Sequence, residues 1–239
     1  MKMSVLAAVL AALVVGAAPV FSAPKYLSPP LGLSGAPKAQ PTVALTLDAC
    51  MGRTDMRIVN ALISNRIPAT IFVTARWMKR NAKALALLKS RPDLFQIENH
   101  GAEHVPAIDV PGRAYGARTA GSPRAVSAEI AGGAAAIQRA TGRKPVWFRG
   151  ATALYTNSSI ALIGRSGARL GGYSMAADGG ALASAATTAR RIASARDGDV
   201  ILAHVNHPGR EAGRGVVEGV LALKRKGFRF VKLGSSASR

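Results

Sequence analysis

The stretch LFQIENHGAEH, residues 94–104, combines a short apolar run with two of the four histidines of the chain. Its first four residues are typical of a buried β-strand. His100 and His104 follow this strand four residues apart, so a single helical turn of backbone would bring both imidazoles to one point, as in sites for Zn²⁺-type ions. The other two histidines, His204 and His207, follow a second apolar run. We therefore predict metal binding by His100 and His104.

The chain of 239 residues is long enough for one large domain or two small ones, and its hydrophobic content of 49% allows a sizeable core. Residues 1–23 are predicted to be a signal peptide or an uncleaved N-terminal anchor, because Lys2 precedes an apolar run from Val5 to Val15. Residues 24–40 hold four prolines and two glycines and are predicted to be an extended linker. One domain is expected over residues 41–239, in an exported protein that is periplasmic or secreted.

The single cysteine and the charge say less about function. One thiol cannot form an internal disulfide, so Cys50 fits export without disulfides and is interpreted as a small buried hydrophobic residue. The net charge of +20 is compatible with association with an anionic envelope surface, and equally with general solubility. Nucleic acid is not expected as a partner, because the chain is predicted to be exported and only 5% of its residues are aromatic.

Apolar strand patterns alternate with helical patterns along the rest of the chain. Strands are expected at residues 42–47, 67–73, 94–97, 145–148, 169–175, 200–203 and 228–233, and helices at 56–63, 77–88, 122–140, 158–163, 181–195 and 215–224. The irregular stretch 105–122 is long enough to be a functional loop. Strands joined by helices are most simply parallel, so we predict an α/β fold with a parallel sheet or barrel.

Five charged or titratable side chains each follow a different predicted strand. The carboxyl ends of parallel strands share one rim of a barrel, and catalytic groups gather at that rim. We therefore expect an active site there, formed by Asp48, His100, Arg149, Asp178 and His204.

These residue types suit metal-assisted hydrolysis of an amide or an ester. A metal held by the two neighbouring histidines would polarise a carbonyl and acidify a bound water. Asp48 could accept a proton from that water or ligate the ion itself, and His204 could protonate the leaving group. Arg149 would keep Asp48 ionised and oriented, and Asp178 would do the same for His204.

Several polar residues also have a structural interpretation. Asp48 could hydrogen-bond turn amides after its strand, and Arg149 could be its ion-pair partner. Asp178 precedes two glycines, in a turn where aspartate is common for backbone reasons. Asp55 is interpreted as the N-cap of the helix that follows it rather than as a metal ligand. His207 precedes a Pro-Gly pair and is interpreted as a surface turn residue.

As a set, the motifs from about Thr42 to Leu233 resemble the polysaccharide deacetylase family, also called carbohydrate esterase family 4 or the NodB-homology group. Residues 46–49, TLDA, are similar to its Thr-Phe-Asp-Asp signature, and residues 100–104, HGAEH, to its His-Ser/Thr-x-x-His metal motif. Residues 148–151, FRGA, are similar to its arginine motif. Asp178 falls where a fourth acidic motif belongs, and residues 202–204, LAH, match its Leu-x-His.

The resemblance implies a distorted (β/α)7–8 barrel of parallel strands and a divalent metal, usually zinc. It also implies that residues 41–239 are a catalytic domain that removes acetyl groups from N- or O-acetylated cell-envelope or extracellular glycans. By this resemblance, Asp48 is the base, His100 and His104 are metal ligands, Arg149 orients the base, and His204 is the acid.

Two departures from the family pattern affect the site. Ala49 replaces the second aspartate, usually the third metal ligand, so either Asp48 takes over, Asp55 reaches in, or the ion is held weakly or not at all. Ala151 and Thr152 replace the usual proline and tyrosine of the arginine motif. The backbone amide of that tyrosine normally stabilises the oxyanion, and an amide survives replacement by threonine. We expect a divergent member with an unusual substrate.

Three other functions fit part of the sequence. The same HGAEH satisfies the H-x-x-E-H pattern of inverted zinc peptidases, but that pattern needs a continuous helix, which Gly101 and Pro106 disfavour. A non-catalytic envelope protein that binds a glycan with the same fold is favoured by Ala49. A Gly-x-Gly-x-x-x-Gly spacing at residues 213–219 suggests a dinucleotide site, but it follows a loop rather than a strand.

Overall fold

The computed structural model of the protein describes residues 26–34 and 39–234. The signal peptide or anchor predicted over residues 1–23 lies outside these described residues. None of the helices in the described ranges combines the length and the apolar character needed to cross a membrane.

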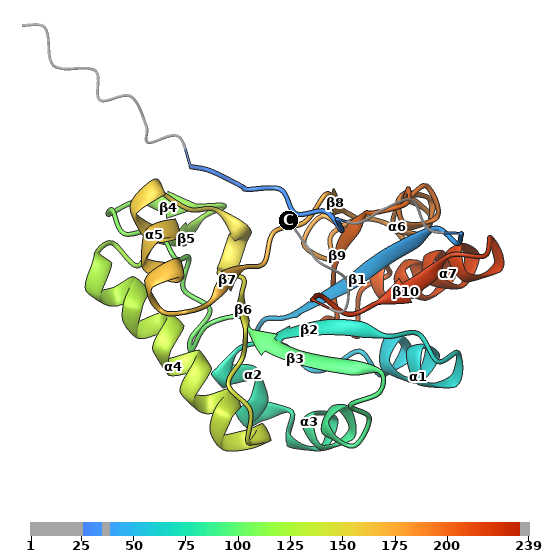
Figure 1. The fold of residues 1–239 in the computed structure, drawn as a ribbon, viewed down its shortest axis with the longest axis horizontal. Helices are drawn as coiled ribbons and strands as arrows, with labels where there is room; N and C mark the ends of the chain where they lie inside the picture. Colours follow the sequence, from blue (N-terminus) through green and yellow to red (C-terminus); the bar gives the residue numbers. More distant parts are fainter. Residues whose placement is uncertain (1–25, 35–38, 235–239) are drawn as a thin grey trace, which may run out of the picture.

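Eight of the described strands form one curved parallel sheet, in the order β7-β6-β3-β2-β1-β9-β8 with β10 beside β1 (Figure 1). The first half of β1 pairs with β10 and the second half with β2, so β10 fits between the two strands as a wedge. The strands are β1 (Thr42–Ala49), β2 (Ala69–Val73), β3 (Phe95–Asn99), β6 (Trp147–Phe148), β7 (Arg169–Leu170), β8 (Met175–Ala176), β9 (Val200–His204) and β10 (Arg229–Val231). The predicted parallel α/β fold, a distorted barrel, is confirmed.

Helices surround the outer side of the sheet (Figure 1). They are α1 (Met56–Ser64), α2 (Ala75–Arg80), α3 (Ala82–Lys89), α4 (Pro123–Thr141), α5 (Asn157–Arg165), α6 (Ala185–Ala193) and α7 (Ala212–Arg225). Local sequence fixes the ends of α4: the Ser122 side chain caps its first turn, and Gly142 ends it with a left-handed φ of 74°. The long loop over residues 105–122 contains a small hairpin, β4 (Arg113–Ala114) and β5 (Ala117–Arg118), and a short 3₁₀ helix covers Ala151–Ala153.

The two faces of β1 have different surroundings because side chains alternate along a strand. Val43, Leu45, Leu47 and Ala49 are fully buried in the main core against the helices. Ala44 packs in a separate cluster on the inner side of the barrel. The same alternation places Thr46 and Asp48 on this inner side, so the strand delivers its polar residues to the interior of the barrel.

The sheet does not close within the described part of the chain, because β7 and β8 are the two ends of the strand order. The segment 26–34 lies along this opening. Leu27 pairs with Tyr155, the Leu31 amide donates to the Tyr173 carbonyl at 3.3 Å, and the Leu33 amide donates to the Gly198 carbonyl at 2.8 Å. Leu31 is only 6% exposed and packs in the cluster of Ala44, Phe72, Trp147, Val200 and Leu233.

The glycines at residues 213–219 serve helix packing. A Cβ on Gly215 would lie 2.3 Å from the Ala185 carbonyl oxygen, and one on Gly219 would lie 2.6 Å from the Ile192 Cβ. Both neighbours belong to α6, so the glycines allow α6 and α7 to approach closely.

Candidate active site

Asp48 and Arg149 form a buried ion pair at the carboxyl end of β1. Arg149 is completely buried, and its Nη1 donates to Asp48 Oδ1 at 2.9 Å and to Thr46 Oγ1 at 3.0 Å. Its remaining nitrogens Nε and Nη2 donate to the carbonyls of Gly171 and Gly172 at 2.7 and 2.8 Å. Burial alone would raise the pKa of Asp48, but the Arg149 charge and then that of His100 lower it below its usual value. Asp48 is therefore ionised and fixed in orientation.

His100 lies beside this pair with both ring nitrogens oriented. Nδ1 is 2.6 Å from the carbonyl oxygen of Arg149, which can only accept, so Nδ1 carries the proton. Nε2 faces Cys50 Sγ at 3.5 Å and Asp48 Oδ2 at 3.8 Å. Burial lowers the pKa of His100, but the charges of Asp48 and Cys50 outweigh this and raise it. The position next to Nε2 therefore favours a positive charge.

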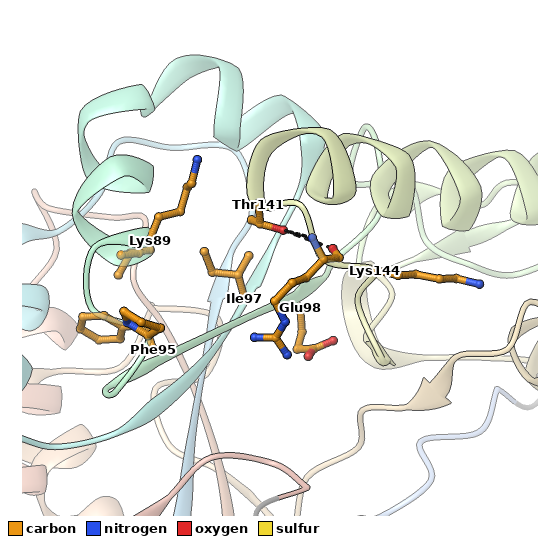
Figure 2. A pocket seen from close by; sticks show the side chains of 9 residues that line it. Lys89, Phe95, Ile97, Glu98, Thr141 and Lys144 are labelled. Atoms are coloured by element: carbon orange, nitrogen blue, oxygen red, sulfur yellow. Dashed lines mark hydrogen bonds between the residues drawn. The ribbon is translucent and has the colours of Figure 1, made fainter.

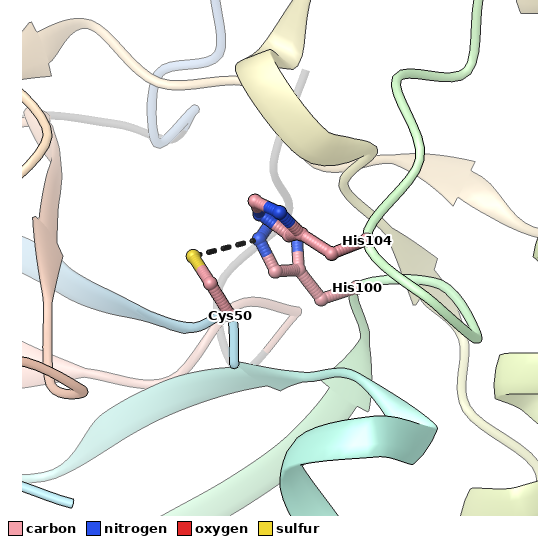
Figure 3. A group of neighbouring side chains, drawn as sticks. All are labelled: Cys50, His100 and His104. Atoms are coloured by element: carbon pink, nitrogen blue, oxygen red, sulfur yellow. Dashed lines mark hydrogen bonds between the residues drawn. The ribbon is translucent and has the colours of Figure 1, made fainter. Parts of the chain in front are cut away.

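Cys50, His100 and His104 form a compact group of metal-type ligands. One ligand atom from each lies within 4.8 Å of the others, and Figure 3 shows the sulfur and the two rings gathered at one point. The two imidazole centroids are 5.0 Å apart. One thiolate and two imidazoles suit zinc, whose catalytic sites commonly have three protein ligands and one open position. The residues present therefore fit the divalent ion that the sequence predicted.

Cys50 is the residue that sequence reasoning left out of the site. Its side chain is 7% exposed, as expected of a buried hydrophobic residue, but its sulfur faces the histidines. The period of two along β1 contains the signal: Asp48 points to the barrel interior, Ala49 points into the helix-side core, and residue 50 is the next position on the inner side. A thiol two residues after a predicted rim aspartate lies on the same side of the strand, and for that reason it is a ligand candidate.

The loop between the two histidines is not helical. Gly101 and His104 both have left-handed backbone, with φ of 96° and 66°. The Glu129 carboxylate of α4 accepts hydrogen bonds from the amides of Glu103, at 3.0 and 3.1 Å, and Val105, at 3.1 Å. A Cβ on Gly101 would lie 2.3 Å from Glu129 Oε1, so only glycine fits against this carboxylate. The loop geometry removes the continuous helix that an H-x-x-E-H peptidase requires.

His204, which is partly buried, and Asp178, which is buried, form a second pair on the other side of Asp48. The β1–β9 register sets His204 directly opposite Asp48. Asp178 is fully buried and accepts from His204 Nδ1 at 2.9 Å and from the His204 amide at 2.6 Å. Burial lowers the pKa of His204, but the hydrogen bond to Asp178 raises it well above its usual value, helped by a hydrogen bond to Cys50. The Asp178 contact therefore favours the protonated form of His204.

The remaining candidates have other positions. Asp55 caps α1 by accepting from the Arg57 amide, and its carboxylate pairs with the Arg57 guanidinium at 2.6 Å, so it is not among the ligand group. His207 is half-buried, with its ring 6.4 Å from that of His204 and Nε2 3.2 Å from Asn206 Nδ2. Thr152 has a left-handed backbone, with φ of 70°, in the 3₁₀ helix just after Arg149.

A separate cavity of about 130 Å³ lies at the opposite end of β3, between α3 and the end of α4 (Figure 2). It is lined by Lys89, Phe95, Arg143 and Lys144, together with the buried carboxylate of Glu98. Burial raises the pKa of Glu98, whose Oε2 accepts from the amides of Val146 and Trp147 at 2.8 and 2.7 Å. No predicted site residue lines this cavity.

Comparisons with known proteins identify the family and the fold. A family model described as "Polysaccharide deacetylase" matches residues 35–171, more than half of the 239 residues. No curated protein matches the chain. Among solved structures, peptidoglycan deacetylase PdaC from Bacillus subtilis is similar with a TM-score of 0.66 and 18% identity, over 82% of this chain and 89% of that one.

Two further solved structures have a similar fold. A family 4 carbohydrate esterase from Streptomyces lividans, in complex with acetate, has a TM-score of 0.64 and 20% identity over 80% of this chain and 91% of that one. A family 4 pseudoenzyme from Bacillus anthracis has a TM-score of 0.64 and 18% identity, over 82% of this chain and 64% of that one. The present chain thus spans slightly less than two thirds of that pseudoenzyme. At these identities the similarity establishes the fold.

Proposed function

Because the chain belongs to the polysaccharide deacetylase family, we propose that it is a metal-dependent hydrolase that removes acetyl groups from an N- or O-acetylated glycan. The observation that carries this proposal is the convergence of three arrangements at one end of the sheet. They are the Asp48–Arg149 pair, the donor group Cys50–His100–His104, and the His204–Asp178 pair.

We propose zinc as the ion and Cys50, His100 and His104 as its protein ligands. A zinc ion bound there would supply a Lewis acid for the acetyl carbonyl. With Cys50 in place of the expected third ligand, Asp48 is left for proton transfer: Oδ1 is held by Arg149, and Oδ2 faces the donor group. This assigns Asp48 one of the two roles that the sequence left open.

The protonation states of the site give each acid or base one task. Asp48 is ionised and can accept a proton from the water that attacks the acetyl carbonyl. His204 is protonated, lies opposite Asp48 across two paired strands, and can give its proton to the leaving nitrogen or oxygen. Asp178 holds the His204 ring in position and stabilises its charge.

A second candidate mechanism uses Cys50 as a nucleophile. Cys50 contributes to the raised pKa of His204, which in turn contacts Asp178, a combination similar to the Cys-His-Asp arrangement of thiol hydrolases. Burial raises the pKa of Cys50, but His100 and the other histidines lower it well below its usual value. The thiolate would attack the acetyl carbonyl, the leaving group would depart with the His204 proton, and water would hydrolyse the acetyl thioester to acetate and free thiol.

Acetate release from a panel of acetylated glycans tests the proposal. The zinc-loaded protein should release acetate and carry one zinc per chain, and Asp48→Asn and His204→Ala should be nearly inactive. A chelator should abolish activity, and zinc should restore it. Activity that survives chelation but is lost to iodoacetamide would favour the thiol mechanism. Glycan binding without acetate release and without zinc would favour the non-catalytic alternative.

The cellular setting is part of the same proposal. The composition of residues 1–23 supports export, and the net charge of +20 supports contact with an anionic envelope. An envelope or extracellular glycan is then the natural substrate. Cell fractionation checks this, and a protein found only in the cytoplasm would contradict it.

A further inference from the structure

A cavity of about 870 Å³ opens beside the loop that leads away from Cys50. It lies between this loop and the junction of α2 and α3, with Arg53 and Thr54 on one side and Arg80, Asn81 and Lys83 on the other. Arg53 is three residues from Cys50, so its backbone lies at most about 10 Å along the chain from the proposed zinc ligand. The cavity therefore adjoins the loop that follows the proposed zinc ligand.

The lining of this cavity carries three positive charges. Arg53, Arg80 and Lys83 are all exposed, and no acidic side chain is among the described residues that form the cavity. The cavity in Figure 2 differs, because there the carboxylate of Glu98 accompanies Lys89, Arg143 and Lys144. A basic cavity without an internal counter-charge favours an anionic ligand.

Asn81 builds this cavity by joining its two sides. Its Oδ1 accepts from the Thr54 amide and the Thr54 hydroxyl, both at 3.0 Å, and its Nδ2 donates to the Gly52 carbonyl at 3.1 Å. Arg80 Nη1 donates to the Met51 carbonyl at 3.4 Å and so lies against the same loop. The cationic side chains are thus held on a framework continuous with Cys50.

We propose that this cavity binds an anionic group, a carboxylate or a phosphate ester, carried by the glycan whose acetyl group lies at the active site. The inference rests on the proposed function and specifies its substrate class as acidic acetylated polysaccharides. Neighbouring sugars of a polymer are covalently linked, so an acidic group held in the cavity would position the acetylated sugar at the adjoining site.

Direct binding tests the inference independently of catalysis. The zinc-loaded protein would be titrated calorimetrically with three oligosaccharides of equal length: one bearing carboxylates, one bearing phosphates and one neutral. At least one acidic oligosaccharide should bind about tenfold more tightly than the neutral one, a preference that falls with salt because the contacts are exposed. The double variant Arg53→Gln/Lys83→Gln should lose most of this preference and still release acetate from a neutral substrate.

A charge-matched control separates a local site from the overall positive charge. Arg139→Gln/Arg225→Gln removes the same charge from exposed positions on α4 and α7 and should keep the preference. Equal binding of acidic and neutral oligosaccharides by the wild-type protein, or equal loss of preference in both double variants, would overturn the inference. Failure of the proposed function has a different signature, namely intact binding without acetate release.

Discussion

His100 is buried and His204 is partly buried at the same end of one sheet, and their Nδ1 atoms have different partners. In His100 the partner is the neutral carbonyl of Arg149, at 2.6 Å, and in His204 it is the carboxylate of Asp178, at 2.9 Å. Either partner fixes a proton on Nδ1, but only the carboxylate strongly stabilises a second proton on Nε2. Under the proposed function, the Nδ1 partner is what separates a metal ligand from a proton donor.

The surroundings of Nε2 also differ between the two histidines. The groups that raise the pKa of His100, Asp48 and Cys50, face its Nε2, where an ion would bind. The main group that raises the pKa of His204 is Asp178, which lies against Nδ1, on the other side of the ring from Nε2. Four predictions can break or sharpen this assignment.

The largest effect is expected when each histidine is removed. His204→Ala should lower kcat by about 10²–10⁴ without loss of zinc, because only proton donation is removed. His100→Ala should lose both zinc and activity. Acetate-release kinetics and elemental analysis of zinc measure the two results. Zinc loss in His204→Ala, or a full complement of zinc in His100→Ala, would break the comparison.

Asp178→Asn should have the next largest effect. Without the carboxylate the pKa of His204 falls, so its active, protonated form is lost at a lower pH and the alkaline limb of the kcat profile moves to lower pH. Activity at neutral pH should fall, since a smaller fraction of His204 is then protonated. The pH–rate profile measures this shift, and an alkaline limb that stays in place would remove His204 as the acid.

Glu129→Gln should mainly affect the zinc ligands. The loop that carries His104 depends on the Glu129 carboxylate for amide hydrogen bonds, so zinc affinity should fall by about 10- to 100-fold. Competition with a chromogenic chelator gives the affinity. Glu218→Gln, on the exposed face of α7, is the matched control and should bind zinc normally. Equal affinities in the two variants would mean that Glu129 does not position the ligands.

Asp55→Ala should have the smallest effect on the site. Loss of the N-cap of α1 should cost about 1 kcal/mol of unfolding free energy, while zinc affinity stays unchanged. Urea denaturation and zinc titration check the two parts. A drop in zinc affinity at constant stability would restore the hypothesis that Asp55 reaches the ion.

Much of this architecture follows from periodicity in the sequence. Alternation of apolar strands and helical patterns indicated the parallel sheet, and the rule that strand ends share a rim brought together residues as distant along the chain as Asp48 and His204. These patterns are local, and the physical forces behind them act within a few residues.

The departures from prediction come from long-range contacts. The predicted strand 169–175 is split into β7 and β8, because the carbonyls of Gly171 and Gly172 accept from Arg149 instead of continuing as a strand. The predicted helix 77–88 is split at Asn81, whose side chain binds the loop after Cys50. Cys50 itself was missed because its chemical role depends on histidines 50 and 54 positions away. The alternation along β1 places residue 50 on the inner side, but it does not show that two histidines lie there.

The strip of chain around Leu31 fills the gap that the strands leave in the wall of the barrel. A truncated protein starting at Pro41 would leave the aromatic surfaces of Phe72 and Trp147 in contact with water. It would also free the Tyr155 and Tyr173 carbonyls that now accept from the strip. Recombinant forms should therefore retain everything from Tyr26 onward, since this stretch belongs to the folded body that carries Arg149 and its partners.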